Sequence, residues 1–218
     1  MIFIEDLTEE LIRGNATAVT RLVGEALAKG IPANTILDKG LIAGMNVVGE
    51  RFRNCEMFLP EVLTAARAMK AGVAQLEPLF AASGIKAAGK ILIGTVKGDI
   101  HDIGKNLVAI MLRGAGFEII DLGVGVPAQK FVEGVKEHNP DIVGMSAMLT
   151  TTMMQMKSSI VALTEAGVRN DVKILIGGAP VNRVFAEEIG ADDYGSNATD
   201  AVEKARGLMK ALKAERGQ

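Results

Sequence analysis

The chain has 218 residues, of which 49% are hydrophobic and 23% charged, and its formal net charge is −2. These values are typical of a soluble globular protein with one large or two small domains. Neither this charge nor the aromatic content of 4% suits a general nucleic-acid surface, so we expect no nucleic-acid partner.

The sequence contains no long uncharged apolar run, and its first residues are acidic, so we expect neither a membrane span nor a signal peptide. The one cysteine, Cys55, cannot form an internal disulfide, and we expect its small side chain to be half-buried. A chain without disulfides fits the reducing cytoplasm, which is the location that we expect.

The first part of the chain has the apolar spacing of helices. One helix is expected at 16–30, where Gly30 ends the pattern, and others within 4–13, 31–54 and 58–80. Short connections make neighbouring helices antiparallel, which predicts a four-helix bundle. Small, polar, glycine-containing residues at 81–90 mark a boundary, so we expect a helical cap domain at 1–88 and a second domain at 89–218.

In the second domain, short apolar runs rich in β-branched residues alternate with helical segments. Strands are expected at 90–96, 117–123, 141–147 and 172–178, and helices at 104–116, 128–139, 152–167, 181–190 and 198–215, with a short segment at 191–197. About five alternations predict an α/β fold in which helices cover both faces of a parallel sheet. Five units favour the flavodoxin-like order, in which the loops after the first and third strands flank the ligand site.

Three groups of residues are expected at the carboxyl edge of this sheet. His101 follows the first strand in TVKGDIHDIGKN, Ser146 ends the third strand, and Gly177 with Gly178 ends the fourth. Open α/β sheets bind their ligands at this edge. The sequence therefore predicts a ligand site to which all three groups contribute.

Several kinds of ligand can be compared at this edge. Asp99 and Asp102 would repel a nucleotide phosphate, and GDIHDIG does not match the G-x-G-x-x-G fingerprint. A phosphoryl-receiver domain would need an aspartate at the end of the third strand, where Ser146 and Met148 stand. These two observations disfavour both a flavodoxin-type phosphate site and a receiver site.

A lone histidine cannot hold a bare metal ion tightly, but it can complete the coordination of a metal that a macrocycle already holds. Asp99 could then accept a hydrogen bond from the other ring nitrogen of His101, and the glycines would let a flat cofactor approach the backbone. The simpler alternative is a solvent-facing loop histidine with capping aspartates, and the residues alone leave it open.

The motif D-x-H-x-x-G, formed by Asp99, His101 and Gly104, is followed by Ser146 and by the pair Gly177 and Gly178. This pattern resembles the cobalamin-binding signature D-x-H-x-x-G…S-x-L…G-G. The segment GLIAGMNVVGERFRNCEMFLPEVLTAARAMKAG, residues 40–72, resembles the cap bundle of methyl-carrying corrinoid proteins. Nearly the whole chain thus resembles the small corrinoid proteins of methyltransferase systems, such as those acting on methylamines, methanol or betaines, and the corrinoid module of methionine synthase.

The resemblance implies that cobalamin is the cofactor and that His101 is the lower axial ligand to cobalt, in place of the cofactor's own benzimidazole base. It further implies that Asp99 hydrogen-bonds His101 and that Thr152 completes this relay. These three residues are the ones to which the resemblance gives a chemical role.

The resemblance also implies where the rest of the cofactor lies. Gly104 would open the slot for the nucleotide tail, and Ser146 with Thr150 would line its pocket. Met148 stands where the signature has leucine, an exchange that conserves volume. In the second domain the implied cofactor-binding residues are Gly98, Asp99, Ile100, His101, Asp102, Ile103, Gly104, Ser146, Met148, Thr150, Thr152, Gly177 and Gly178. In the cap, Phe58, Leu59 and Val62, with Met45, would cover the upper face of the corrin.

By the same resemblance the chain is a cytoplasmic methyl carrier without complete turnover of its own. It would take a methyl group from a substrate through one substrate:corrinoid methyltransferase and pass it on through a second methyltransferase, with a reductive activator as a further partner. Two alternatives share the D-x-H-x-x-G module: the cobalamin subunit of a mutase, and a cobalamin-dependent sensor. The segment FLPEV disfavours the mutase, and the lack of a basic recognition helix disfavours the sensor.

Overall fold

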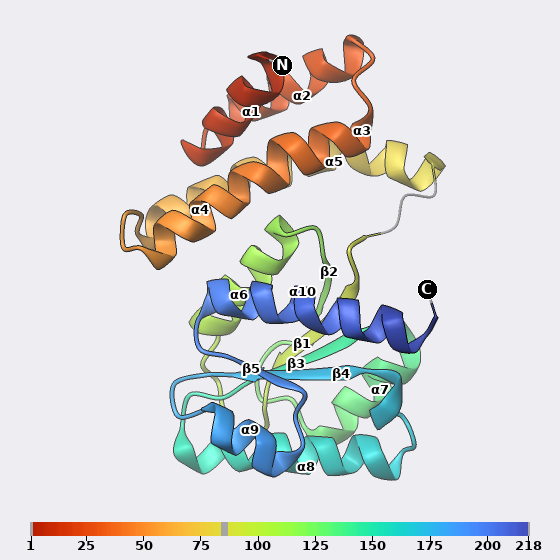
Figure 1. The fold of residues 1–218 in the computed structure, drawn as a ribbon. Helices are drawn as coiled ribbons and strands as arrows, with labels where there is room; N and C mark the ends of the chain where they lie inside the picture. Colours follow the sequence, from red (N-terminus) through yellow and green to blue (C-terminus); the bar gives the residue numbers. More distant parts are fainter. Residues whose placement is uncertain (1, 84–86, 218) are drawn as a thin grey trace. The chain divides into compact units, whose positions relative to one another are not determined.

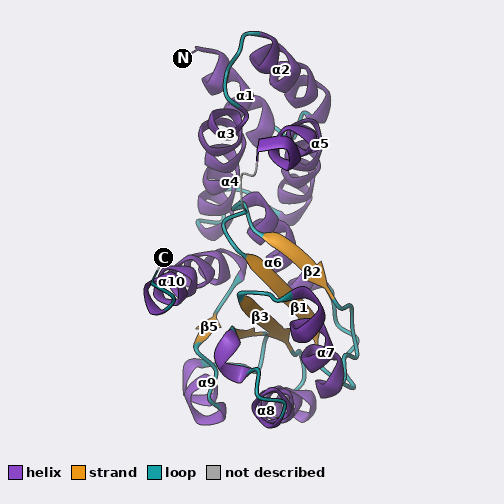
Figure 2. Ribbon diagram, turned by 90° about the vertical axis from the view of Figure 1, so that its right-hand side faces the viewer, coloured by secondary structure: helices purple, strands orange, loops and turns teal. Residues whose placement is uncertain are grey.

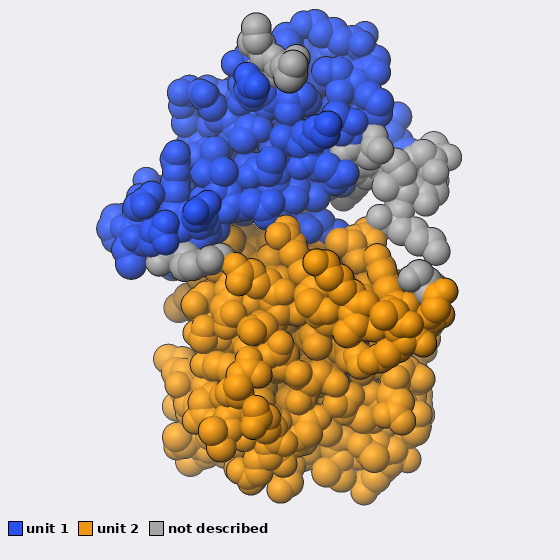
Figure 3. Space-filling view, in the orientation of Figure 1, with its two compact units in different colours: residues 1–86, 114–116 blue, residues 87–113, 117–218 orange. Residues whose placement is uncertain are grey.

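The computed structural model describes residues 2–83 and 87–217. The chain forms two compact units, one of residues 1–86 and 114–116 and the other of residues 87–113 and 117–218 (Figure 3). The boundary segment predicted at 81–90 includes residues 84–86, which lie outside the described part of the chain. Among the described helices, none is long and apolar enough to cross a membrane.

The first unit is helical (Figure 1). Its described residues form α1 (Ile2–Ile12), α2 (Ala16–Ala28), a continuous helix made of α3 (Ala33–Thr35), η1 (Ile36–Ile42) and α4 (Ala43–Arg53), and α5 (Leu59–Ser83). Asn15 begins α2 by accepting a hydrogen bond from the N–H of Ala18 at 3.1 Å. These elements give the helical bundle that the apolar spacing predicted.

Close packing of α1 against the third helix depends on two glycines one turn apart. A Cβ atom on Gly40 would lie 2.7 Å from Leu7, and one on Gly44 would lie 2.8 Å from Leu11. Gly40 belongs to η1, where the helix has π-type hydrogen bonding. The hydroxyl of Thr8 lies 2.9 Å from the Ile4 carbonyl of its own helix and 3.1 Å from the Gly40 carbonyl, so α1 approaches the backbone of this widened turn closely.

A short loop leads from α4 into α5. Cys55 lies in this loop with a φ of 59° and is exposed, so the prediction that it is half-buried was wrong. The tight turn holds its side chain away from the packed face of either helix. The N–H of Phe58 donates to the Glu61 carboxylate at 2.8 Å, which caps the start of α5 from one side.

The second unit contains a five-stranded parallel sheet in the order β2-β1-β3-β4-β5 within its described residues. The strands are β1 (Lys90–Thr95), β2 (Glu118–Asp121), β3 (Ile142–Ser146), β4 (Lys173–Gly177) and β5 (Asp193–Gly195). The helices are α6 (Ile103–Gly114), α7 (Ala128–His138), α8 (Thr150–Glu165), α9 (Arg183–Ile189) and α10 (Ala198–Glu215), with a short 3₁₀ turn η2 (Arg169–Asp171). Helices α7, α8 and α9 cover one face of the sheet, and α6 and α10 cover the other (Figures 1 and 2). The predicted α/β class and strand order are confirmed.

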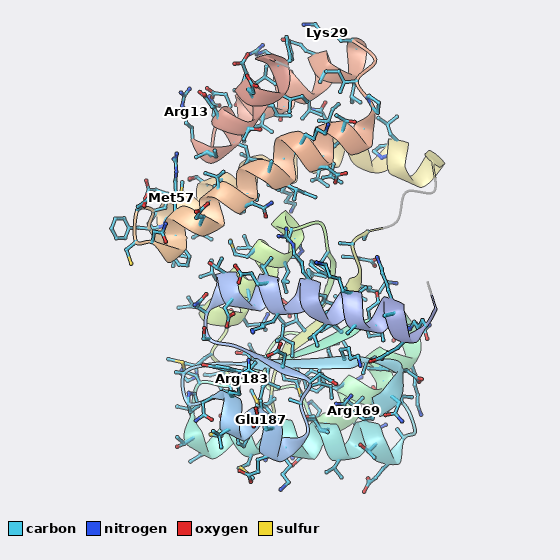
Figure 4. All side chains as sticks on the ribbon, in the orientation of Figure 1. Arg13, Lys29, Met57, Arg169, Arg183 and Glu187 are labelled. Carbon is cyan, nitrogen blue, oxygen red and sulfur yellow. The ribbon has the colours of Figure 1, made fainter. Side chains whose placement is uncertain are left out.

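Strand β5 is only three residues long, and two ion pairs stabilise its N-terminal end. Arg169 contacts the Asp192 carboxylate at 2.9 Å and donates to the Gly190 carbonyl at 2.8 Å. Arg183 contacts Asp193 at 2.9 Å. Both arginines lie in the lower part of the second unit in Figure 4. So short a strand gains little from its own ladder, and these contacts help to fix it at the edge of the sheet.

The register of the strands aligns their carboxyl ends. Thr95 of β1 pairs with Ser146 of β3, which in turn pairs with Gly177 of β4, and Gly177 pairs with Gly195 of β5. A buried core that includes Leu92, Val143 and Ile174 lies behind this row. The loops that follow β1, β3 and β4 therefore begin at one level, which is the edge where the sequence predicted a ligand site.

Candidate cofactor-binding site

The loop between β1 and α6 is fixed by its own backbone before any side chain contributes. Gly98 has a φ of 80°, a conformation that favours glycine, and the N–H of Asp99 donates to the Val96 carbonyl at 3.1 Å. The hydroxyl of Thr95 donates to the His101 carbonyl at 2.9 Å. These contacts turn the chain sharply at the end of β1 and bring the Asp99 carboxylate within hydrogen-bonding distance of the His101 ring.

Asp99 is 0% exposed, and each of its oxygens has short hydrogen bonds. Oδ1 accepts from the backbone N–H of His101 at 3.1 Å and lies 2.7 Å from its Nδ1. Oδ2 accepts from the Thr152 hydroxyl at 2.6 Å and from the N–H of Met148 at 2.7 Å. The carboxylate thus joins the histidine loop to the start of α8, with donors enough to satisfy a buried charge.

The hydrogen bonds determine the charge of Asp99. Burial by itself raises the pKa of this carboxyl, but the bonds from Thr152, Met148 and His101 outweigh burial and hold the pKa far below its usual range. Asp99 is therefore a carboxylate at neutral pH and can only accept. Nδ1 of His101 must donate to it, which in the neutral imidazole leaves the lone pair on Nε2.

The Nε2 edge of the His101 ring is the edge that does not contact Asp99. The His101 side chain is half exposed, and no described residue hydrogen-bonds Nε2. Its neighbours Ile100 and Ile103 are 78% and 73% exposed, and Met148 and Leu149 of the next loop are exposed as well. A buttressed histidine among exposed apolar side chains is suited to a ligand that is itself largely apolar and carries a metal.

The donor set excludes one kind of metal site in the described residues. No group of three or more histidine, cysteine, aspartate or glutamate side chains there could hold a metal ion. A single imidazole nitrogen fits a metal whose other positions a macrocycle already fills. The chemistry of these residues therefore fits a corrinoid better than a free ion.

Two glycines at this edge differ in their surroundings. A Cβ atom on Gly104, in the first turn of α6, would have no atom within 4 Å, and an alanine there would favour the helix. A Cβ atom on Gly178 would lie 1.8 Å from the Ala147 carbonyl oxygen, and Gly178 has a φ of 129°. Packing of the protein therefore requires glycine at Gly178, whereas the space beside Gly104 is open to a ligand.

The remaining predicted residues of the second unit lie at the same edge. Ser146 is half-buried at the end of β3, Thr150 is exposed at the start of α8, and Asp102 is exposed beside His101. Gly177 lies close to β5, because its Cβ atom would be 3.0 Å from the Gly195 carbonyl oxygen. The structure thus brings together the residues that the sequence singled out after β1, β3 and β4.

The four predicted residues of the first unit differ in exposure. Phe58 is 66% exposed at the start of α5 and Leu59 is half-buried, whereas Val62 and Met45 are buried. Leu63 is exposed one turn after Leu59 and was not among the predicted residues, although its spacing of four residues from Leu59 was the available signal. The exposed apolar surface at this helix start therefore includes Phe58 and Leu63.

The loop after β2 was also missed. The N–H of Gly125 donates to the Asp99 carbonyl at 2.9 Å, and the N–H of Gly123 donates to Asp121 at 2.8 Å. Lys105 is buried and pairs with Asp121. The strand order could have placed this loop beside the histidine loop, since β2 neighbours β1, but a buried lysine has no signature in sequence.

Comparison with known proteins matches both units. Two models of B12 binding domains match the chain, one over residues 89–203 and the other over residues 3–77. The dimethylamine corrinoid protein of Methanosarcina barkeri is 47% identical over 208 residues, covering 94% of this chain and 97% of the relative. The trimethylamine corrinoid protein of the same organism is 46% identical, covering 92% and 97%.

Two solved structures are similar over most of the chain. A cobalamin-binding protein from Desulfitobacterium hafniense has a TM-score of 0.78 and 36% identity, covering 95% of this chain and 99% of that one. The methanol:cobalamin methyltransferase complex of Methanosarcina barkeri has a TM-score of 0.86 and 29% identity, covering 98% of this chain and 84% of that one. The chain therefore belongs to the corrinoid proteins of methyltransferase systems, and its cofactor is cobalamin.

Proposed function

We propose that this chain carries a methyl group on a cobalamin whose cobalt is coordinated by Nε2 of His101, with the cofactor's own base displaced. The observation that carries the proposal is the arrangement around His101. Asp99 fixes the Nδ1–H tautomer, and Nε2 is left without a partner among the described residues, within an exposed apolar surface. A metal-binding imidazole is commonly oriented in this way.

In this proposal Asp99 and Thr152 hold His101 at a fixed angle and keep the ligand nitrogen basic. The open space beside Gly104 takes the nucleotide tail of the cofactor. Ser146 and Thr150 offer hydroxyl groups to that tail. Met148, in the loop between β3 and α8, covers it. Gly177 and Gly178 let the base lie against the backbone of β4. Gly98, Ile100, Asp102 and Ile103 complete the surface on which the corrin rests.

The first unit contributes shielding. In this proposal Phe58 and Leu59 would cover the upper face of the corrin, together with Val62 and Met45, which are buried in the first unit. An apolar cover excludes water and oxygen from a reactive centre. A methyl donor must reach that centre, so this proposal requires the cover to open during methyl transfer.

When bound, the cofactor supplies a cobalt that accepts a methyl group and releases it to a nucleophile. The described residues form a helical unit and a five-stranded α/β unit and no substrate barrel, so we propose that the chain works in the cytoplasm between two enzymes, a substrate-specific methyltransferase and a second methyltransferase, with a reductive activator. Its methylamine corrinoid relatives and its similarity to the methanol:cobalamin methyltransferase complex support this arrangement. Selection of the methyl donor then belongs to the partner enzyme.

The decisive experiment is the visible spectrum of the chain reconstituted with hydroxocobalamin, beside His101→Ala and beside His138→Ala as the matched control. His138 lies at the end of α7, away from the carboxyl edge. We expect a histidine-ligated spectrum from the original chain and the control, and a ligand-free spectrum or loss of binding from His101→Ala. An unchanged spectrum in His101→Ala would overturn the assignment of the axial ligand.

A further inference from the structure

Lys105, in the first turn of α6, is only 3% exposed, which is unusual for a lysine. A buried ammonium group must be paired. Its Nζ lies 2.5 Å from Oδ2 of Asp121, at the end of β2. The other oxygen of Asp121 accepts from the N–H of Gly123 at 2.8 Å. The ion pair therefore joins the start of α6 to the end of the neighbouring strand and to the loop that follows it.

The contacts continue from Lys105 toward the histidine. Lys105 Nζ also donates to Oδ1 of Asn106 at 2.8 Å, and Nδ2 of Asn106 donates to Oδ2 of Asp102 at 3.0 Å. The backbone N–H of Asn106 donates to the Asp102 carbonyl at 2.7 Å. A polar chain thus runs from Asp121 through Lys105 and Asn106 to Asp102, the residue after His101.

His101 is consequently held from two sides. The residue two before it, Asp99, is bound to the start of α8 through Thr152 and Met148. The residue after it, Asp102, is bound to the end of β2 through the polar chain. We propose that Lys105 and Asn106 are positioning residues that orient His101 toward the cobalt, an inference that rests on the proposed axial role of His101.

A purely stabilising role would not require this chemistry. Replacing a buried ion pair by apolar side chains of similar volume is often neutral or stabilising. A hydrogen-bonded pair instead fixes geometry, and α6 has a particular need for it. Gly104 leaves the preceding position without a side chain, so no packing on that side holds the first turn. The pair of Lys105 with Asp121 fixes the first turn of α6 on its buried side, while the space beside Gly104 stays open.

The test uses the full chain with Lys105→Met and Asn106→Ala, and Lys130→Met as the matched control. Met replaces the lysine stem without its charge, whereas Lys130 forms an exposed pair with Glu133 on α7 at 2.8 Å. Each variant is titrated with hydroxocobalamin, and the fraction of bound cofactor with a histidine-ligated visible spectrum is measured. The electron paramagnetic resonance of the Co(II) form reports the axial nitrogen directly. The cofactor-free chain, labelled with ¹⁵N-histidine, reports the ring signals of His101, and thermal unfolding reports stability.

We expect Lys105→Met to weaken cofactor binding by about 10-fold, the lower end of the range for outer-shell partners of a metal ligand. In part of its bound cofactor, the electron paramagnetic resonance spectrum should lack the splitting caused by an axial nitrogen. In the cofactor-free chain, the ¹⁵N signals of the His101 ring should broaden or divide. Asn106→Ala should change the cofactor affinity, the spectrum of the bound cofactor and the His101 ring signals in the same direction but less. Lys130→Met should change none of these three. Asn106 is exposed, so Asn106→Ala keeps the test decisive even where Lys105→Met fails to fold.

Two results would overturn the positioning role, and a third would overturn the proposed function. Folded Lys105→Met and Asn106→Ala chains with the original affinity, spectrum and ring signals would overturn the positioning role. Loss of thermal stability in Lys105→Met, with the spectrum and affinity of folded Asn106→Ala unchanged, would also overturn it and leave a structural role. An unchanged spectrum in His101→Ala would instead overturn the proposed function, whatever Lys105 does.

Discussion

The hydroxyl of Thr152 lies 2.6 Å from the Asp99 carboxylate, across 53 residues of sequence. This contact joins the loops after β1 and β3, and through Asp99 it reaches His101. The same hydroxyl also lies 3.0 Å from the Leu149 carbonyl, but its single proton favours the shorter contact to the charged oxygen. The hydroxyl is therefore one of the short-range donors that hold the buried carboxylate.

Replacing this hydroxyl by a methyl group tests that contact. Thr152→Val keeps the shape of the side chain but removes one of the donors to a buried carboxylate. We expect the free energy of unfolding to fall by about 1.5–3 kcal/mol, the range for a hydrogen bond to a charged group. Urea denaturation measures it. Thr151→Val, one position earlier and exposed, is the control and should change stability by less than about 0.5 kcal/mol.

The depressed pKa of Asp99 predicts a dependence of stability on pH. Because the pKa is lower in the folded than in the unfolded chain, the ionised carboxylate stabilises the fold above its unfolded pKa of about 3.9. That contribution should be lost progressively as the pH falls from about 5 toward the folded value. Urea midpoints measured between pH 7 and pH 3 should fall more steeply for the original chain than for Asp99→Asn. Parallel curves for the two chains would contradict the prediction.

Two exposed glycines in helices allow a matched test of the open space beside His101. A Cβ atom added at Gly104 in α6 or at Gly207 in α10 would have no atom within 4 Å, so alanine fits at both positions. Each substitution should leave stability unchanged or raise it by up to about 1 kcal/mol, because alanine is the better helix former. Cobalamin binding, followed by titration, should weaken only in Gly104→Ala. Equal binding by both variants would mean that the cofactor does not use this space.

Gly178 should tolerate no side chain for a reason internal to the protein. The Cβ atom of Gly178→Ala would overlap the Ala147 carbonyl oxygen, and the backbone φ is positive. We expect a loss of at least about 2 kcal/mol in the free energy of unfolding. Gly190→Ala separates the two causes, because Gly190 has a φ of 79° with no atom nearby and should lose only about 1 kcal/mol. Circular dichroism during denaturation measures both.

Replacing Phe58 should change the reoxidation rate of the bound cofactor and leave the stability of the fold almost unchanged. It is exposed, so Phe58→Ala should change stability by less than about 0.5 kcal/mol. The reduced, reconstituted chain should reoxidise faster in limiting oxygen, because an apolar cover has been removed. Leu79→Ala, another exposed apolar residue of α5, is the control. Equal reoxidation rates in all three chains would argue against a shielding role.

Much of the architecture could be read from the sequence because it depends on periodicity. The alternation of apolar runs predicted the strands that end at Thr95, Ser146 and Gly177, and the motif around His101 predicted the loop. Strand order followed from the number of βα units. These features depend on neighbouring residues or on simple topology, so a single sequence contains them.

Features that depend on side-chain burial could not be predicted. Lys105 is charged and opens a helix, so its sequence context indicates an exposed residue, yet Asp121 holds it inside. Val62 and Leu63 are adjacent apolar residues, and only packing decides that the first is buried and the second exposed. The π-type hydrogen bonding of η1, which includes Gly40, likewise has no signal in the local sequence.

The long separation between Asp99 and Thr152 also sets an order of events during synthesis. A chain emerges from the ribosome with its N-terminal part first, so α1 to α5 and β1 are available well before α8. Until the ribosome has passed residue 152, the histidine loop lacks the hydroxyl and backbone donors that hold its carboxylate. The nascent protein therefore completes α1 to α5 before the donors to Asp99 are in place, and if His101 has the proposed axial role, cofactor binding would follow only after α8 has begun to form.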